Sequence, residues 1–535
     1  MATDLIPFGN LKEAGFEELS GASPHAFNVI VDARATMRRR PGIVAYNTAY
    51  SGIIDAGGIT GVHATTGEKI FAVGAATGDT YASSIYAVSD TAAVNISSNT
   101  SQKLYGQGRP VFAETEALLC VTQGNEIKRI QTTDPSFPIA TLGVPPGADL
   151  DPSGSVESHF ISGVTYASIY QFPPTLDAAS GTSQLPPFCS HIAVNSSRIL
   201  GNDTLIDKTK IRFSDISIGT TDFSGHDTWT PGPNTAGFFT AEANADPVVA
   251  VFENTNEVFT FGERVLQVFG PDPNLVFATV SAIELGCCAP YSVVKRNQSF
   301  WWLDTRRRFV FSDGRAFDES IGNPIKPVVD SFSRVDDCYG FSVIEGAVDA
   351  IVWVFPTAGR ALCYQPGVGW GEWASWSESA NRWAPLSITA HHLNVNDAVN
   401  VVGTSDGRIG RLSRNASTDL GVRMKAFIET GFLDRGTSSK KRTRAVRLTL
   451  RRGETASTSS TGPMGYLSWR DSLGPWESPL EVALGRSGDF QTVVTFYSLG
   501  GTYRTRQWRF EFDGDDELVL VKVEEDFDVL GQPPE

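Results

Sequence analysis

Short apolar runs separated by polar turn residues recur along most of this chain. Between residues 246 and 315, three runs of about five residues are interrupted by Asn-Thr-Asn, Gly-Glu-Arg and Ser-Asp-Gly, which is typical of short antiparallel strands joined by hairpins. Apolar residues spaced as on one face of a helix are scarce, and the pattern predicts one short helix at residues 324–333. We therefore expect an all-β protein.

From about residue 57 to residue 416, pairs of such strands recur roughly every 40 to 60 residues. Radial repetition of small sheets protects many strand edges at once, so the pattern predicts a β-propeller of six or seven blades. The tetrapeptide Ser-Asp-Gly-Arg occurs at 312–315 and again at 405–408. We expect equivalent hairpin tips with type I′ turns there. The candidate tip residues, which could equally be ordinary solvent-facing turns, are Asp313, Gly314, Asp406 and Gly407.

Residues 417–535 carry a different repeat, in which residues 442–450 match residues 504–512 position by position. In both segments every second residue is large and apolar, while Arg447 and Arg509 fall on the opposite side of the pleat. Two strands with one buried face each predict a C-terminal β-sandwich. The predicted organisation is an N-terminal arm and first strands at 1–56, a propeller at 57–416 with a Pro/Gly/Ser-rich insertion at about 144–187, and a sandwich at 417–535.

Composition agrees with this architecture and adds a charge argument. The chain has 51 Gly and 29 Pro in 535 residues, and its formal net charge is −16. Residues 1–416 hold 28 basic and 42 acidic residues, a net of −14, whereas residues 417–535 hold 16 and 18, a net of −2. An acidic surface repels phosphate, so tight non-specific binding of DNA is disfavoured. The same charge could serve only to keep a large protein soluble.

Six cysteines lie mostly in apolar surroundings without a CxxC pair, so we expect reduced thiols and assembly in a cytoplasm. The first ten residues lack the basic and apolar regions of a signal peptide, and no apolar run reaches about 18 residues, so no membrane-spanning segment is expected.

Two basic groups are candidate contacts to other subunits or partners. The first, before Pro41-Gly42, could instead pair with local acids, and the second lies on the two matching strands of the predicted sandwich. These candidates are Arg38, Arg39, Arg40, Arg442, Arg444, Arg447, Arg504, Arg506 and Arg509.

No set of residues predicts catalysis, a metal or a cofactor. His391 and His392 are adjacent on a strand and face opposite ways, so with Asp397 they make a poor metal site. Four acids at 513–517 could hold Ca²⁺ or simply form an acidic hairpin tip. The metalloprotease motif HExxH and the nucleotide-binding motif GxxxxGK[ST] are absent from the sequence, and the single GxSxG match, at residues 403–407, overlaps a predicted hairpin tip. Trp370, Trp373 and Trp376 either stack on sugar rings or pack between blades.

Residues 261–269 (FGERVLQVF) and 286–294 (GCCAPYSVV) resemble two segments of the packaged-DNA stabilisation, or tail hub (nozzle), proteins of short-tailed bacteriophages. That family carries an "fGxrxIexf" strand pair followed by a "GxxxPyxvv" strand. Looser similarities are Asn28, Asp32 and the Arg-Pro-Gly at 40–42, the strand at 361–365, and a late "RxRxxxFxxxV" strand. The long insertion and the acidic propeller depart from the family.

The resemblance implies a structural virion protein, assembled in the host cytoplasm and located in the phage tail. Such proteins form a ring, here expected to have about six copies, below the portal–adaptor ring. The ring extends the DNA channel, contacts tail needle, plug or fibre proteins, and lets DNA pass without specific binding. No enzyme activity is implied. The alternative from another class is a β-propeller tail adhesin that binds or cleaves glycans.

Overall fold

The structure is a computed structural model of the 535-residue chain, and the part that it describes is all-β apart from one α-helix and short 3-10 turns. The described residues are 2–5, 26–31, 37–46, 52–75, 82–89, 92–98, 102–106, 108–116, 118–141, 157–161, 164–168, 186–205, 207–217, 225–229, 231–232, 235–241, 246–346, 348–394, 398–452, 464–472, 474–484, 491–497, 499–513 and 518–531. They divide into a central unit (55–290 and 312–317) and a terminal unit (1–54, 291–311 and 318–535).

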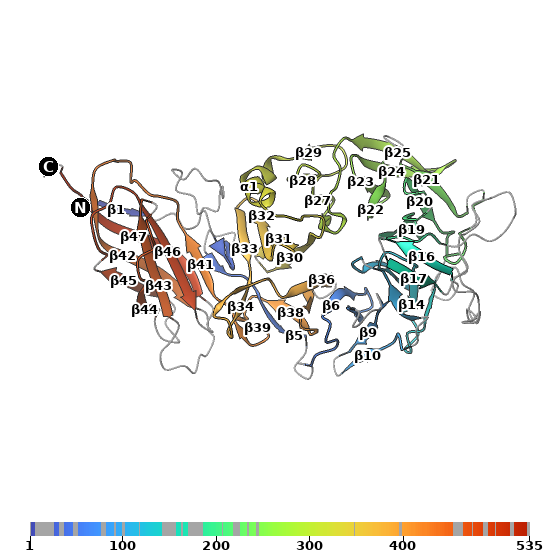
Figure 1. The fold of residues 1–535 in the computed structure, drawn as a ribbon, viewed down its shortest axis with the longest axis horizontal. Coiled ribbons are helices and arrows are strands. Elements are labelled where there is room, and N and C mark those ends of the chain that lie inside the picture. Colours follow the sequence, from blue (N-terminus) through green and yellow to red (C-terminus); the bar gives the residue numbers. More distant parts are fainter. Residues whose placement is uncertain are drawn as a thin grey trace. The chain divides into compact units, whose positions relative to one another are not determined.

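The central unit contains four antiparallel sheets of four strands each (Figure 1). In chain order they are β6 (Ile59–Ala64), β7 (Ile70–Gly74), β9 (Ile85–Val88) and β10 (Ala93–Asn95); β12 (Val111–Glu114), β13 (Leu118–Thr122), β14 (Lys128–Gln131) and β15 (Ile139–Thr141); β18 (Ile192–Asn195), β19 (Arg198–Asn202), β20 (Lys210–Phe213) and β21 (Gly237–Thr240); β22 (Val248–Asn254), β23 (Glu257–Gly262), β24 (Leu266–Asp272) and β25 (Val276–Ile283). Aromatic side chains such as Phe239, Phe269 and Phe277 form one buried cluster between the third and fourth sheets, as expected for neighbouring blades.

Two small strand pairs accompany these sheets: β8 (Ala82–Ser83) with β11 (Leu104–Tyr105), and β16 (Glu157–Ile161) with β17 (Val164–Ser168). The pair β16–β17 falls in the predicted insertion at 144–187. Most of that insertion lies outside the described residues.

The terminal unit continues the series with three further four-stranded arrangements. They are β26 (Val294–Arg296), β27 (Ser299–Leu303), β28 (Phe309–Ser312) and β29 (Phe317–Asp318); β30 (Tyr339–Glu345), β31 (Val348–Phe355), β32 (Arg360–Gln365) and β33 (Gly369–Trp373); β36 (Ile388–Asn394), β37 (Val399–Thr404), β38 (Ile409–Ser413) and β5 (Gly42–Ala45). A hairpin of β34 (Ser375–Ser377) and β35 (Arg382–Ala384) lies between the last two. With the four sheets of the central unit these make seven blades, which confirms the predicted β-propeller.

The predicted helix at 324–333 is also present, as a 3-10 segment at Ser320–Ile325 followed by α1 (Lys326–Asp330).

The last blade is completed by a strand from the beginning of the chain. β5 pairs antiparallel with β38, and its other edge is covered by β39 (Thr418–Asp419), which in turn pairs with β40 (Val422–Arg423). Gly42 allows this packing, because a Cβ atom there would lie 2.5 Å from the carbonyl oxygen of Thr418.

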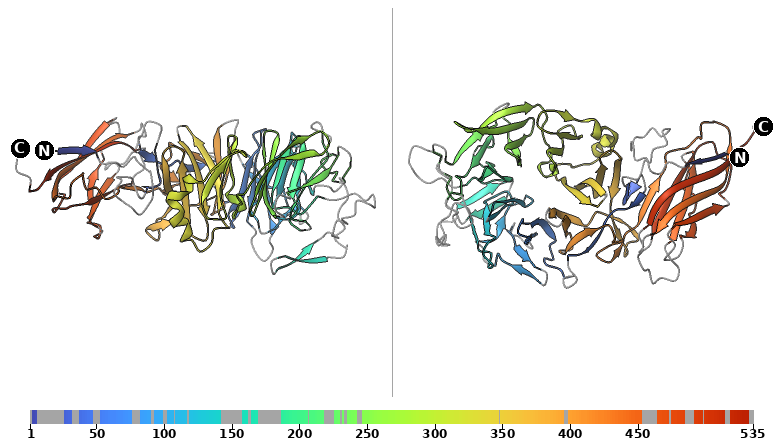
Figure 2. Two further views of the ribbon diagram at one scale, coloured as in Figure 1. Left: turned by 90° about the horizontal axis from the view of Figure 1, so that it is seen from above. Right: turned by 180° about the vertical axis from the view of Figure 1, so that it is seen from behind.

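Two sheets form the predicted sandwich and face each other in Figure 1 and in the right view of Figure 2. One has the order β3 (Val29–Val31), β4 (Met37–Arg39), β47 (Leu518–Val529), β42 (Lys441–Arg452) and β45 (Gln491–Tyr497), with β1 (Ala2–Leu5) also on β47. The other has β41 (Ala426–Glu429), β46 (Arg506–Asp513), β43 (Met464–Asp471) and β44 (Leu480–Ala483). The two matching apolar rows meet in one buried core, which confirms the expected burial: Val446, Leu448 and Leu450 of β42, and Trp508, Phe510 and Phe512 of β46.

The N-terminal segment, for which the sequence predicted an arm and first strands, supplies strands to several sheets. β2 (Ala26–Phe27) runs parallel to β33 of a blade and antiparallel to β41 of the sandwich. These pairings give one continuous nine-stranded sheet, in the order β30-β31-β32-β33-β2-β41-β46-β43-β44. The first 45 residues therefore contribute strands to both sandwich sheets and to the last blade. Apart from the local pair β3–β4, the partner strands lie hundreds of residues away, so local pattern could not reveal these pairings.

A buried arginine holds this junction together. All five donors of the Arg40 guanidinium are used: Nε binds Asn28 Oδ1 at 2.9 Å, Nη1 binds the carbonyl of Pro41 and Asp419 Oδ1, and Nη2 binds the carbonyl of Ala374 and Asp419 Oδ2. Asn28, with φ of +54°, donates in turn to the carbonyls of Ala374 and Lys425. Arg40 is 1% exposed, so these contacts are shielded from water.

We expect Arg40→Ala to lower the free energy of unfolding by about 3–5 kcal/mol, because it leaves the Asp419 carboxylate buried without its cation. Denaturant unfolding followed by circular dichroism measures the change. The control is Arg334→Ala, which breaks an ion pair with Asp336 whose side chains are 57% and 58% exposed, and which should leave the free energy of unfolding nearly unchanged. Equal losses in the two variants would contradict the role given to Arg40.

Candidate functional site

The nine candidate arginines do not form one surface. Arg506, like Arg40, is buried and uses all five donors, on Asp471, Thr443 and the carbonyls of Leu499 and Gly500. Both guanidinium groups are therefore bonded inside the chain, and we no longer propose them as contacts to a partner.

Arg39 is 8% exposed and donates to the carbonyl of Met424 at 3.3 Å, with its guanidinium over the ring of Phe512. Arg38 is partly buried on the same strand, β4. The cluster at 38–40 thus packs mainly against the C-terminal part of the chain, and the acid that Arg40 binds, Asp419, is distant in sequence rather than local.

The remaining arginines lie on the outer faces of the sandwich sheets. Arg444 pairs with Asp528 and Arg447 with Asp526, both across from β42 to β47, and hydrogen bonding to Asp526 raises the pKa of Arg447. Arg509 pairs with Glu429 across from β46 to β41. Arg442 and Arg504 are exposed, and Arg504 donates to the carbonyl of Ser438. Of the nine, these two leave their charged groups most open to a partner.

The two Ser-Asp-Gly-Arg segments are not equivalent, contrary to the sequence-based expectation. Residues 312–315 connect the third and fourth strands of a blade (β28 and β29), whereas residues 405–408 connect the second and third (β37 and β38). Neither turn is type I′, because only Gly314 and Gly407 have positive φ, +88° and +84°. The aspartates stay at negative φ because each carboxylate is held by local partners.

Those partners differ between the two turns. Asp313 accepts hydrogen bonds from the backbone N–H groups of Ala316 and Arg315, which lowers its pKa. Asp406 binds Arg408 and Thr404, and these bonds outweigh its partial burial and lower its pKa as well. Arg315 reaches to Glu257 at 2.5 Å. Charges at both turns are thus largely satisfied within the chain.

No group of three or more His, Cys, Asp or Glu side chains converges on a common point among the described residues. His391 stacks on Phe341 and binds Asn400 at 3.0 Å. Asp397 and the acidic residues 514–517 lie outside the described part of the chain. No helix of the described part has the length and apolar character needed to cross a bilayer.

The tryptophans at 370–376 have different environments. Trp370 and Trp373 are 5% and 1% exposed. Trp370 packs between two blades, with its ring tilted against Phe309 of β28 and against Tyr364 of its own blade. Trp376 is half-buried, with the Lys425 ammonium 4.1 Å from its ring centroid. Only the third tryptophan of the set is placed to meet a ligand.

Trp376 is one end of a partly exposed row of aromatic and cationic side chains that follows the nine-stranded sheet. Trp383 lies 5.4 Å from Trp376 and 5.7 Å from Phe427, measured between ring centroids. Further along, Arg509 lies 4.2 Å and Arg470 4.9 Å from the ring of Trp476. We call this set, together with Lys425, the aromatic–cation row.

Trp and Arg are the residues that most often dominate protein interfaces, so the aromatic–cation row is a candidate binding surface. Sequence reasoning missed it because its members come from four separate segments, and no local motif joins them. Only the sheet pairing, β2 with β41 and β41 with β46, brings them together.

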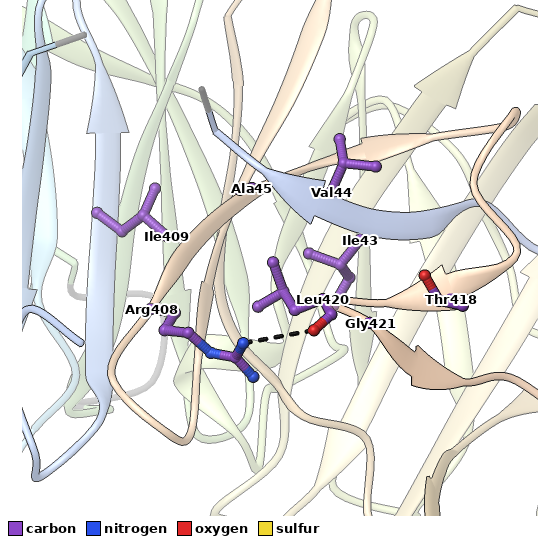
Figure 3. Close-up of a pocket in the computed structure, with 8 residues that line it drawn as sticks. All are labelled: Ile43, Val44, Ala45, Arg408, Ile409, Thr418, Leu420 and Gly421. Atoms are coloured by element: carbon purple, nitrogen blue, oxygen red, sulfur yellow. Dashed lines mark hydrogen bonds between the residues drawn. The ribbon is translucent and has the colours of Figure 1, made fainter. Parts of the chain in front are cut away.

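Figure 3 shows a hollow of about 260 Å³ beside β5 and β38. Its lining is mainly apolar: Ile43, Val44, Ala45, Arg408, Ile409, Thr418, Leu420 and Gly421. The Arg408 guanidinium at its edge already binds Asp406 and the carbonyl of Leu420. The hollow therefore lacks the converging polar groups that orient a substrate.

No family model and no curated protein matches this chain. Virginiamycin B lyase from Staphylococcus aureus is a similar solved structure, with 10% identity, a TM-score of 0.39 and coverage of 70% of this chain and 99% of that one. The extracellular domain of a hybrid two-component system from B. thetaiotaomicron has 8% identity and a TM-score of 0.38, over 85% of this chain and 47% of that one. An exo-beta-1,3-galactanase from Phanerochaete chrysosporium has 9% identity and a TM-score of 0.25, over 91% and 100%. At such values no activity is carried over.

Burial raises the pKa of the Cys120 thiol to about 12, and it also raises the pKa values of Cys189 and Cys363. Cys287 and Cys338 are buried, whereas Cys288 is half-buried. We therefore expect a thiol reagent at pH 8 to modify Cys288 alone in the folded protein, and all six cysteines in urea. Mass spectrometry of the wild type and of Cys288→Ser checks this; rapid modification of any other thiol would contradict it.

Burial lowers the pKa of His191 to about 3. Below a pH of about 6.5, the ordinary pKa of histidine, this side chain takes up a proton in the unfolded chain but stays neutral in the folded chain. Protonation therefore stabilises the unfolded chain, and the free energy of unfolding falls as the pH falls. We expect it to cost about 2 kcal/mol of stability between pH 7 and pH 5. Urea unfolding at both pH values should show a smaller loss for His191→Asn. Identical losses in the two proteins would contradict the assignment.

Proposed function

We propose that this chain is a structural protein of a short phage tail, in which a ring of about six copies forms a hub or nozzle below the portal–adaptor ring. The observation that carries the proposal is the nine-stranded sheet, which runs without a break from a propeller blade into the sandwich. Together with the sequence resemblance at 261–269 and 286–294, it supports a building block rather than a catalyst.

Neighbouring domains of one chain usually move relative to each other unless a large apolar interface fixes them. Here β2 replaces a flexible linker by strand pairing on both sides, and the buried Arg40 and Asp419 lock the same junction. Blade and sandwich then behave as one body. A ring that retains DNA under pressure needs this property, whereas a glycan-binding site on one blade does not.

Charge is distributed in a way that suits passage of DNA. The central unit, residues 55–290 with 312–317, holds 25 acidic and 11 basic residues, a net charge of −14, and the terminal unit holds the remaining −2. A basic channel would bind phosphates and release counterions at each contact, which holds DNA in place. We propose that DNA instead passes without specific binding, and that a closure of loops or a needle or plug protein retains it.

A second candidate function, glycan binding by a tail adhesin, is favoured by the half-buried pair Trp376 and Trp383, whose rings lie 5.4 Å apart. Loss of binding to host polysaccharide in Trp376→Ala, or depolymerisation of that polysaccharide by the wild type, would support this function over the first.

Electron microscopy of purified particles and of the isolated protein tests the ring. We expect a closed ring of about six copies around a channel, because a cyclic head-to-tail contact makes a passage that a single propeller is too narrow to provide. We also expect weak binding of duplex DNA at low salt. A chain that is monomeric or absent in particles, or that binds duplex DNA at micromolar concentration with a steep salt dependence, would contradict the proposal.

A further inference from the structure

Among the last strands of the seven blades, β25 is unusual in length and exposure. β10, β15, β21 and β29 have 3, 3, 4 and 2 residues, and β33 and β5 are covered by β2 and β39. β25 has eight residues, Val276–Ile283, and within the described residues it pairs with β24 alone. Figure 1 shows it at the border of the central unit.

Apart from a bulge, β25 also lacks the usual protection of an open edge. Its sequence, VFATVSAI, contains no charge and no proline, and Val280 is 48% exposed. Natural proteins shorten, charge or cover such strands because free N–H and C=O groups recruit other strands. A bulge at Val280 interrupts the register with β24, which leaves Val276–Thr279 and Ser281–Ile283 as regular stretches on either side.

The turn that leads into β25 has an exposed apolar side chain and an unusual backbone conformation. Leu275 is 68% exposed, more than any other large apolar side chain among the described residues. Val276 has φ of +65°, a conformation that β-branched residues rarely adopt. Asp272 holds the turn by accepting bonds from the N–H groups of Asn274 and Leu275. Exposed apolar surface and backbone strain at one place indicate a contact site.

The sandwich has a comparable open edge in β45. This strand, QTVVTFY, is uncharged and pairs only with β42 in the described part of the chain, and its outer face presents Val493 and Tyr497, 58% and 66% exposed. The edge strand of the opposite sheet, β44, carries the exposed Glu481 and has four residues. Among the described residues, the chain thus protects one sandwich edge and leaves the other open.

We propose that β25 of one copy pairs edge to edge with β45 of the next copy, which joins a blade of one subunit to the sandwich of its neighbour. This inference rests on the proposed ring and names its interface. The strands have eight and seven residues, so a joint sheet could extend over about 23 Å, at about 3.3 Å per residue. Exposed apolar side chains on both, Val280 with Val493 and Tyr497, would be buried at the joint.

A second copy fits better than an unrelated partner, because both unprotected edges belong to the same chain. Each copy offers one β25 and one β45, so the contact is head-to-tail and repeats until the ring closes. Pairing of β25 with another β25 would stop at a dimer and leave every β45 exposed.

Lysine substitutions in the middle of each edge test the pairing, since charged side chains on an edge strand oppose its pairing with another strand. Thr279→Lys and Thr495→Lys should each weaken self-association at least about tenfold. The control is Val94→Lys, at a 57% exposed position on the short last strand β10, which should assemble like the wild type. Native mass spectrometry measures assembly in solution, and electron microscopy measures it in particles; unchanged thermal unfolding shows that each variant is folded.

Mixing the two lysine variants decides the geometry. A mixture retains one intact β25 and one intact β45, on different chains, so we expect a one-to-one dimer that neither variant forms alone. If both variants form rings as the wild type does, the strand pairing is wrong although the ring remains. If only Thr279→Lys impairs assembly, β25 has another occupant and the proposed pair is wrong. A wild-type chain that never self-associates, in solution or in particles, contradicts the proposed function itself.

Discussion

The ion pair between Arg40 and Asp419 is the interaction on which the rest of the terminal unit depends. A guanidinium at 1% exposure is tolerated because each of its five donors has an acceptor, and those acceptors come from four separate parts of the chain. Satisfying them fixes the direction in which the chain leaves β4. This places β5 against β38 in the last blade and holds β2 between β33 and β41. Hydrophobic burial alone would allow other registers, but a buried charge with five specific acceptors allows one.

The sandwich contains a second buried arginine whose donors all have acceptors. Arg506 is also fully buried with five donors occupied, and beside it Glu525 is held by Arg435, Thr443 and Tyr503. Burial and the adjacent Glu525 raise the pKa of Tyr503 well above its ordinary value, so the phenol stays a donor to that carboxylate. Removing such groups from water is unfavourable, and the cost is offset only when every polar atom has its partner. In return, these buried groups specify one arrangement of the strands. This protein requires such specificity because it pairs long strands from both ends of its sequence.

The sequence could predict what is local and could not predict what is distant. Alternation of apolar residues in β42 and β46 correctly gave two strands with one buried face each, because the side-chain period of a strand depends only on its neighbours along the chain. The contacts of Asn28 with Ala374 and of Arg40 with Asp419 join residues 346 and 379 positions apart, so no window of sequence contains both partners. The prediction of two equivalent Ser-Asp-Gly-Arg turns was wrong for a related reason. Identical residues connect different strands of their blades, and the hydrogen bonds of the aspartate side chains favour another turn type. The aromatic–cation row could not be predicted from the sequence either, because its residues come from four separate segments.

Edge protection connects these features. Within the chain, open edges are covered by added strands: β1 lies on β47, β2 on β33, and β39 on β5. Strand addition therefore already determines how distant parts of this molecule are joined. The same physics applies between molecules, since a free row of N–H and C=O groups does not distinguish a strand of its own chain from one of another. This chain shortens, charges or covers most of its edges. Where the structure describes it, however, β25 and β45 are long, uncharged and paired on one side only, which are the features of a subunit whose last two strand pairings are made by its neighbours.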